Sequence, residues 1–218
     1  MPPPPNKKRR VDKPNVRNLS ILVPPSRTVG SPVLEAYADP VDGVQLGETT
    51  IHKCVEAADI EAAEQHFHRL QAVHKLSKLT PGVPTIRYIN LQSTFIKYVQ
   101  DKAPAQPLVM WSMTKAQAAS FYEKAKAVLT VAHRVGIRHR DINPWNVLFN
   151  GEAVFLVDWD HLDREQGNLH WIIKAGGDPA LAEDISKMSA FGEEADLARL
   201  AAIRDVWLVK RPAPSYFA

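Results

Sequence analysis

The stretch HRDINPWN, His139–Asn146, constrains this chain more than any other part of its sequence. Residues with helical spacing over 115–136 precede it, and two short apolar runs follow it, the second of which ends at Asp158. Two acids, Asp141 and Asp158, and the amide of Asn146 therefore fall within eighteen residues, at the ends of predicted strands. Each of them alone is better explained as a turn cap or the start of a strand. Their joint occurrence after a long helix favours a functional site.

The composition is that of an ordinary globular chain of 218 residues, with 45% hydrophobic and 23% charged residues. That length suits one domain, or two small lobes that share a cleft. The single cysteine, Cys54, excludes an intramolecular disulfide and a Cys-rich zinc module, and it favours a reducing, intracellular compartment. We expect no membrane span, because no apolar run is long enough, and no secretory signal, because no apolar segment follows the basic N-terminus.

The positive charge is concentrated in a leader. Residues 1–20 hold six of the 27 basic residues and one of the 24 acidic ones, so the rest of the chain is near neutral. We therefore expect no nucleic acid as substrate and no general nucleic-acid-binding surface. The Pro-rich and basic segment 1–18 is predicted to be disordered. Its KKRR run, Lys7–Arg10, is similar to a nuclear-localisation signal, which a nuclear-import receptor would bind; a solvated tail is the open alternative.

The first half of the body is predicted to be rich in strands. Alternating and β-branched residues indicate strands between Leu19 and Glu56. A helix is expected over 59–78, with Asp59 as its cap. Two further strands, at 85–90 and 93–99, precede a polar, Pro-containing connector.

The second half is predicted to be mostly helical. Its longest helix begins after the cap residue Thr114 and ends at Gly136, which suits the left-handed conformation common at helix ends. After the polar loop, NVLF and AVFLVD form a pair of strands joined by a turn. The last helix is expected over 192–209.

These motifs resemble the catalytic centre of the protein-kinase-like superfamily. His139-Arg140-Asp141 is similar to the HRD loop, Asn146 to the metal-binding Asn after it, and Asp158-Trp159-Asp160 to Asp-Phe-Gly. The resemblance implies an α+β, bilobal fold, with a β-rich N-lobe over 19–101 and a truncated helical C-lobe over 102–218. It also implies ATP and Mg²⁺ as cofactors.

The resemblance implies roles for individual residues. Asn146 and Asp158 would hold Mg²⁺, since hard cations take oxygen ligands. Asp141, preceded by Arg140, would orient the attacking hydroxyl and accept its proton. Lys53, on the strand before the first helix, would bind the phosphates of ATP.

Two further residues complete the predicted ATP site. Glu64 is expected to point inward as the partner of Lys53, because it shares a helix face with Ile60 and Phe67. No G-x-G-x-x-G occurs, so Gly30, between the first two predicted strands, is the candidate for a loop whose N–H groups cover the phosphates. A plain hairpin at Gly30 is the open alternative.

The sequence also departs from the kinase pattern. Asp160 replaces the Gly of Asp-Phe-Gly, no Ala-Pro-Glu follows, and only 58 residues remain after Asp160. These departures predict a minimal, atypical kinase.

The acceptor is less constrained than the reaction. Arg140 before the acid favours a protein substrate, and Ser/Thr is our first expectation. However, Asn143 stands where Ser/Thr kinases usually have Lys, and DINPWN is similar to the DxHPxN pattern of aminoglycoside and choline phosphotransferases. VDWDHLDR is similar to lipopolysaccharide sugar kinases. A small-molecule kinase therefore stays open, as does a pseudokinase that serves as an interaction module.

The KKRR leader favours a destination inside a eukaryotic cell, in the cytoplasm or nucleus. Small effector kinases that pathogens deliver into host cells combine such a destination with a reduced C-lobe. Secretion by a route that the sequence does not show is therefore part of this hypothesis.

The histidines predict no zinc site. His66, His68 and His74 share the first predicted helix, without a carboxylate or cysteine at ligand spacing. His139 is expected to be a structural hydrogen-bonding residue beneath the loop rather than a general base.

Overall fold

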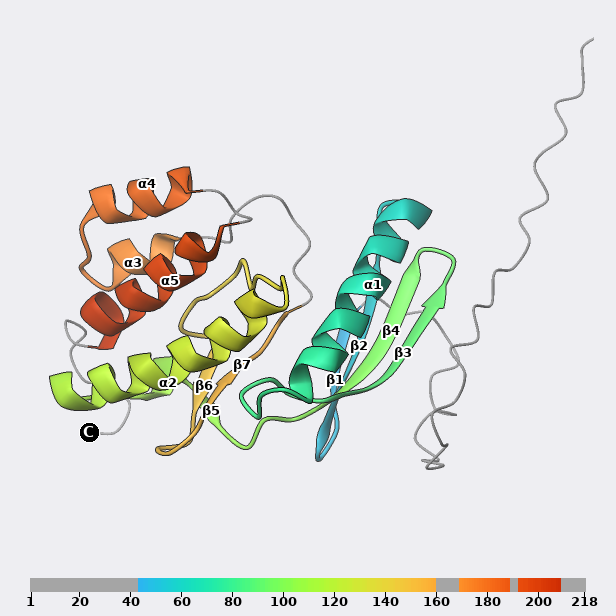
Figure 1. Cartoon of the computed structure of the whole chain (residues 1–218), viewed down its shortest axis with the longest axis horizontal. Helices are drawn as coiled ribbons and strands as arrows, with labels where there is room; N and C mark the ends of the chain where they lie inside the picture. The colour runs from blue at the N-terminus through green and yellow to red at the C-terminus, as the bar shows by residue number, and fades with distance from the viewer. Residues whose placement is uncertain (1–42, 160–168, 189–191, 209–218) are drawn as a thin grey trace, which may run out of the picture.

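The computed structural model describes residues 43–159, 169–188 and 192–208. They form two lobes side by side, one built on a sheet and the other mainly helical (Figure 1). The α+β fold with a sheet lobe first and a helical lobe second is confirmed. The predicted leader and the strands expected before Gly43 lie outside the described residues. None of the described helices has the length and apolar character needed to cross a membrane.

The sheet lobe is a four-stranded antiparallel sheet in the order β1-β2-β4-β3, and helix α1 packs on one face of it (Figure 1). Its elements are β1 (Gly43–Leu46), β2 (Thr50–Glu56), α1 (Ile60–Ser77), β3 (Ile86–Gln92) and β4 (Phe95–Asp101). The helix and both strands predicted after it are confirmed, with bounds that differ by one or two residues.

Helix α1 begins where the sequence predicts. The Asp59 carboxylate accepts the N–H of Ala62 at 2.8 Å, which satisfies one of the free N–H groups at the start of the helix. Its buried face carries Ala63, Phe67 and Leu70 against the sheet. Apolar burial of this kind, rather than helix propensity, stabilises a helix of this length.

The helical lobe contains a small three-stranded sheet in the order β5-β6-β7, which lies beside α2 (Figure 1). Its elements are β5 (Gln106–Pro107), η2 (Leu108–Met110), α2 (Lys115–Arg134), β6 (Val147–Phe149), β7 (Val154–Leu156), α3 (His170–Lys174), α4 (Pro179–Lys187), α5 (Glu193–Ala202) and the π-helical turn η3 (Ile203–Trp207). The predicted long helix, strand pair and last helix are confirmed.

Helix α2 has a cap at each end that the sequence predicts. Thr114 and Gln117 form a capping box at its start, and Gly136 adopts φ +78° just after its end. The chain therefore leaves α2 sharply and enters the polar loop at His139.

The two lobes contact each other at the connector between α1 and β3. The Leu156 N–H donates to the Gly82 carbonyl at 2.8 Å, so the connector is bonded to β7 of the helical lobe. A β-carbon at Gly82 would lie 2.3 Å from Val128 on α2, so only glycine permits this approach. Buried apolar side chains of both lobes form one cluster across this junction.

Candidate active site

The polar loop after α2 is held from below by one buried acid, Asp196 of α5. Its two carboxylate oxygens accept the backbone N–H groups of His139 and Arg140, each at 2.8 Å. His133 of α2 hydrogen-bonds the same carboxylate at 3.0 Å. Arg140 has φ +73°, a strained conformation for a residue with a side chain. Asp196 therefore stabilises the backbone turn that presents the next residue, Asp141.

The charge of Asp196 is preserved despite its burial. Burial raises the pKa of this carboxyl, but the hydrogen bonds from His133 and from the His139 and Arg140 backbones outweigh it, so the pKa lies below its ordinary value. A carboxylate that stays ionised can accept all of these hydrogen bonds at once.

His139 has the structural role that the sequence predicts. It is fully buried, its Nε2 bonds the Val157 carbonyl at 2.8 Å, and its ring lies 4.5 Å from the Trp159 ring. Burial lowers its pKa, opposed by the charges of Asp196 and Asp141, so the neutral imidazole is favoured. His139 thus links the loop to the segment that carries Asp158.

The Asp141 carboxylate is oriented by two amides. Asn146 donates to its Oδ2 at 2.8 Å and Asn143 at 3.1 Å, and both also donate to its backbone carbonyl. Asn143 Oδ1 accepts the N–H groups of Trp145 and Asn146, which closes the turn between them. The other carboxylate oxygen of Asp141, Oδ1, lies 4.0 Å from Nη1 of the buried Arg199 of α5.

Arg199 contributes a buried positive charge near Asp141. Its side chain is 1% exposed, and burial lowers its pKa, while Asp141 and Asp196 act in the opposite direction. Burial likewise lowers the pKa of Arg140.

Asn146 and Asp158 lie at the same end of the β6–β7 hairpin. Asn146 directly precedes β6, Asp158 follows β7 by two residues, and the Val157 N–H donates to the Asn146 carbonyl at 2.9 Å. Asp158 has φ +61°, and its side chain is 46% exposed. The two predicted metal ligands are thus brought together by a short antiparallel ladder.

Lys53 of β2 reaches across from the sheet lobe to Asp158. Its Nζ lies 2.5 Å from Asp158 Oδ1, and its side chain is 11% exposed. Lys53 pairs in register with Tyr98 of β4, so both point to the same face of the sheet, and Nζ lies 5.7 Å from the Tyr98 ring. The pair Lys53–Asp158 joins the two lobes at the site.

The inward orientation predicted for Glu64 is wrong. Glu64 is exposed on α1, whereas Ala63, Phe67 and Leu70 are buried. The prediction took Ile60 as a member of the buried face, but Ile60 is 52% exposed at the first turn of the helix. Lys53 forms an ion pair with Asp158. Gly30, the candidate for covering the phosphates, lies outside the described residues.

Arg69 of α1 makes the contact between this helix and the site. Its Nε donates to the Trp159 carbonyl at 2.5 Å and its Nη2 to the Arg138 carbonyl at 2.6 Å. Sequence reasoning missed Arg69, Asp196 and Arg199. For Asp196 and Arg199 a signal exists, because both lie at helical spacing among the apolar residues of α5, such as Leu200.

The donors at the hairpin end fit a hard divalent cation. Asp158 offers a half-exposed carboxylate, and Asn146 offers its Oδ1, because its amide nitrogen already donates to Asp141. Over the described part of the chain, no group of three or more His, Cys, Asp or Glu side chains could hold a metal ion. One carboxylate and one amide suit Mg²⁺, which commonly completes its shell with water and phosphate oxygens.

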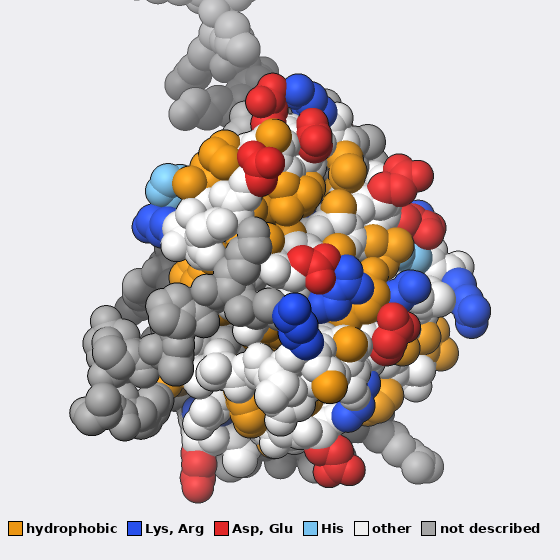
Figure 2. Space-filling model, turned by 90° about the vertical axis from the view of Figure 1, so that its left-hand side faces the viewer, with side chains coloured by type: hydrophobic (Ala, Val, Ile, Leu, Met, Phe, Trp, Pro, Cys, Tyr) orange, Lys and Arg blue, Asp and Glu red, His pale blue; other side chains and the backbone are white. Residues whose placement is uncertain are grey.

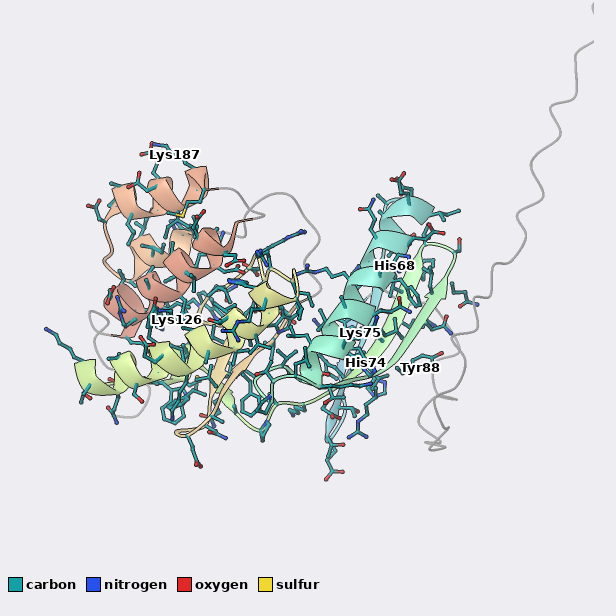
Figure 3. The ribbon with its side chains drawn as sticks, in the orientation of Figure 1. His68, His74, Lys75, Tyr88, Lys126 and Lys187 are labelled. Carbon is teal, nitrogen blue, oxygen red and sulfur yellow. The ribbon has the colours of Figure 1, made fainter. Side chains whose placement is uncertain are left out.

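Two of the histidines on α1 lie apart along the helix. His68 and His74 lie at separate turns of α1 (Figure 3). The ring of His74 bonds the Ile86 carbonyl at 2.6 Å, which ties α1 to β3. His68, in contrast, is exposed and hydrogen-bonds Gln71 of the same helix at 3.3 Å.

The surface of the helical lobe carries charges of both signs. Basic and acidic side chains are interspersed with hydrophobic ones over this face (Figure 2). A small cavity of about 150 Å³, lined by Trp111, Phe121 and Phe149 among others, lies at the start of α2. It contains none of the site residues named above.

Comparisons with known proteins give partial structural similarity and no family. No family model and no curated protein matches the sequence. Solved kinase structures do match: PK-1 of the Cydia pomonella granulovirus (15% identity, TM-score 0.44, 52% of this chain and 45% of that one), and a cysteine-to-alanine variant of the PknI kinase domain of Mycobacterium tuberculosis (16% identity, TM-score 0.49, 77% of this chain and 66% of that one). The chain thus spans less than two thirds of either structure.

The order of elements is that of a truncated protein-kinase-like fold. A helix is inserted into an antiparallel sheet, a long helix and a polar loop follow, and a strand hairpin ends at an acid. The superpositions are partial and of low identity, and they carry no statement about substrate.

Proposed function

We propose that this chain is an ATP- and Mg²⁺-dependent phosphotransferase that acts on a hydroxyl acceptor. The observation that carries the proposal is the 2.5 Å contact between Lys53 of the sheet lobe and Asp158 of the helical lobe. It places a cation and a carboxylate together beside Asn146, at the end of the hairpin. Binding of a metal-loaded triphosphate needs both groups. A cationic side chain binds the phosphate oxygens, and oxygen-bearing side chains bind the metal ion.

Each side chain then has a separate task. Lys53 binds phosphate oxygens, and Asp158 and Asn146 hold Mg²⁺. When bound, Mg²⁺ neutralises the charge on the phosphate oxygens. Asp141 accepts the hydrogen bond of the acceptor hydroxyl at its carboxylate, which the amides of Asn143 and Asn146 keep in one orientation.

Two basic residues lie near Asp141. Arg199 lies 4.0 Å from Oδ1, and Arg140 directly precedes Asp141 in the chain. An ionised carboxylate is the form that can accept the proton of the hydroxyl. Glu64 is exposed, so the proposal assigns it no contact with ATP; the role of Gly30 remains the sequence-based proposal given above.

The first acceptor that we propose is a Ser or Thr of a protein. It rests on Arg140 before Asp141 and on the basic run Lys7–Arg10, which favours action inside a eukaryotic cell, including a host cell that receives an effector. The second candidate is a small-molecule hydroxyl. Asn143 favours this second candidate. It stands where Ser/Thr kinases usually have a Lys, and here its amide donates to Asp141 instead.

The test compares nucleotide binding and transfer in the wild type and Asp158→Ala. ATP with Mg²⁺ at 100 times its Kd should stabilise the wild type by about 2.7 kcal/mol in a thermal-shift measurement. Asp158→Ala should lose the Mg²⁺-dependent part of this stabilisation and nearly all transfer of labelled phosphate. Lys53→Met should also cut transfer strongly, because a phosphate-binding cation is lost.

The matched control is Asp205→Ala, which removes an exposed acid paired with Arg204 away from the site. It should keep the wild-type rate. A wild type that ATP and Mg²⁺ do not stabilise would instead favour a non-catalytic interaction module. Label that appears only in small metabolites would exclude the protein acceptor and support the second candidate.

A further inference from the structure

Helix α1 is attached to the site by a residue that the proposed function does not use. Arg69 lies at the middle of the helix, and its half-buried side chain leaves the sheet lobe to meet two backbone carbonyls of the helical lobe. One carbonyl belongs to Arg138, the residue before His139. The other belongs to Trp159, the residue after Asp158.

We propose that Arg69 is a positioning residue that holds the polar loop and the Asp158 segment in the arrangement that binds metal-loaded nucleotide. This inference rests on the proposed function. Arg69 meets the backbone beside these groups, at Trp159 and Arg138, and it acts through Asp158 and through the start of the loop. We call its two hydrogen bonds the Arg69 bridge.

The guanidinium group suits the task because of its geometry. Its Nε and Nη2 donate in two fixed directions, at 2.5 Å to Trp159 and 2.6 Å to Arg138. Charge-assisted hydrogen bonds of this length are stronger than neutral ones. A lysine has a single donor centre and cannot match this fork, so the bridge requires arginine.

Both carbonyls that accept the bridge lie in well-held segments. The Arg138 side chain bonds Glu193 of α5 at 2.7 Å, and the Trp159 indole donates to the Leu156 carbonyl at 2.6 Å. The bridge therefore connects segments that other hydrogen bonds already hold in place. It sets the distance between α1 and two rigid parts of the helical lobe.

Asp158 is the group whose position should depend most on the Arg69 bridge. It is 46% exposed, has φ +61°, and is adjacent to Trp159. Lys53, its ion-pair partner, comes from the sheet lobe. If α1 moves away, Trp159 loses its bond to Arg69 while Lys53 moves with the sheet, so both supports of Asp158 weaken together.

The test replaces Arg69 by Met, which keeps the apolar stem and removes the donors, and by Lys, which keeps the charge. Hydrogen exchange without nucleotide is the first readout. Peptides that cover 138–141 and 156–159 should exchange about 10-fold faster in Arg69→Met, because two charge-assisted bonds are lost. Arg69→Lys should fall between Arg69→Met and the wild type.

The second readout is the Mg²⁺ dependence of transfer. In Arg69→Met the apparent Mg²⁺ constant should rise about 10- to 100-fold, while binding of ATP without metal stays near the wild-type value. A role in folding alone would lower the amount of active protein and leave the Mg²⁺ constant unchanged. The control is Arg87→Met, which removes an exposed arginine of β3 whose partner is Asp101 of the same lobe.

The two proposals fail in different ways. Unchanged hydrogen exchange, or faster exchange with an unchanged Mg²⁺ constant, would overturn the role of Arg69 and leave the phosphotransferase intact. A wild type that binds no nucleotide with Mg²⁺ would overturn the phosphotransferase and, with it, the positioning of Asp158 for metal. Equal effects of Arg69→Met and Arg87→Met would also overturn the bridge.

Discussion

The polar loop and the Lys53–Asp158 pair, the two halves of the site, are held in different ways. The loop is organised within the helical lobe by a buried acid, Asp196, and by the amide of Asn143. The pair instead joins side chains of different lobes, and its acid is 46% exposed. The half to which we assign the acceptor is therefore preorganised, and the half to which we assign the phosphates depends on the relative position of the two lobes.

This difference separates stability from nucleotide binding. Groups buried under the loop contribute to the free energy of unfolding, because removing one leaves others without partners. An ion pair whose acid is half-exposed contributes little to stability, but in the proposed function it can still decide whether phosphates bind.

The largest expected effect comes from Asp196→Ala. It leaves the N–H groups of His139 and Arg140 and the ring of His133 without their acceptor, so we expect a loss of about 3–5 kcal/mol in the free energy of unfolding. Urea denaturation measures it. Lys53→Met is the contrasting variant, with a loss below about 1 kcal/mol. Glu194→Ala, at an exposed position of the same helix, controls for helix effects. Equal losses in Asp196→Ala and Lys53→Met would contradict the comparison.

An intermediate effect is expected from Asn143→Ala, which acts mainly on the acceptor half. Asp141 loses one of its two orienting amides, so kcat should fall about 10-fold, equivalent to the loss of one hydrogen bond, with ATP binding unchanged. Steady-state kinetics with ATP and acceptor varied separately would resolve this. Asn150→Ala is the matched control, because Asn150 caps the β6–β7 turn in the same way, by accepting N–H groups of Glu152 and Ala153. The same fall in kcat in both variants would contradict a role at Asp141.

The smallest expected effect is a pH dependence of stability from His139. Burial lowers its pKa below the ordinary 6.5, so below that pH the unfolded chain binds a proton that the folded chain does not. The stabilisation is thus complete above pH 6.5 and is lost as the pH falls toward the folded-state pKa, by at most about 1.4 kcal/mol per pH unit. Unfolding curves at pH 7 and below measure the slope. His139→Gln should flatten it, whereas His68→Gln, at an exposed position, should not; equal slopes in all three proteins would contradict the assignment.

The parts of the fold that local signals specify could be predicted from the sequence. Asp59, Thr114 and Gly136 mark helix ends through their own backbone and side-chain chemistry, and these ends are confirmed. The spacing of Asn146 and Asp158 around a hairpin likewise places them together, because antiparallel strands bring the start of one beside the end of the other.

Tertiary contacts could not be predicted in the same way. Asp196 is 57 residues from His139 in sequence, and only the fold brings its carboxylate under the loop. The inward prediction for Glu64 failed because helical spacing gives the shape of a buried stripe and not its rotation about the axis. Arg69 was missed because a long side chain on a partly buried face predicts solvent contact as readily as a bond across lobes.

The close packing at Gly82 has a mechanical consequence for the sheet lobe. The connector that contains Gly82 follows the C-terminal end of α1 and is bonded to β7, so this end of the helix is anchored on the helical lobe. We therefore expect a rotation of the sheet lobe to pivot there, with a displacement that grows along α1 toward Ile60. Arg69 lies partway along α1. A small rotation of the whole lobe would therefore change the distances from its guanidinium group to the Trp159 and Arg138 carbonyls.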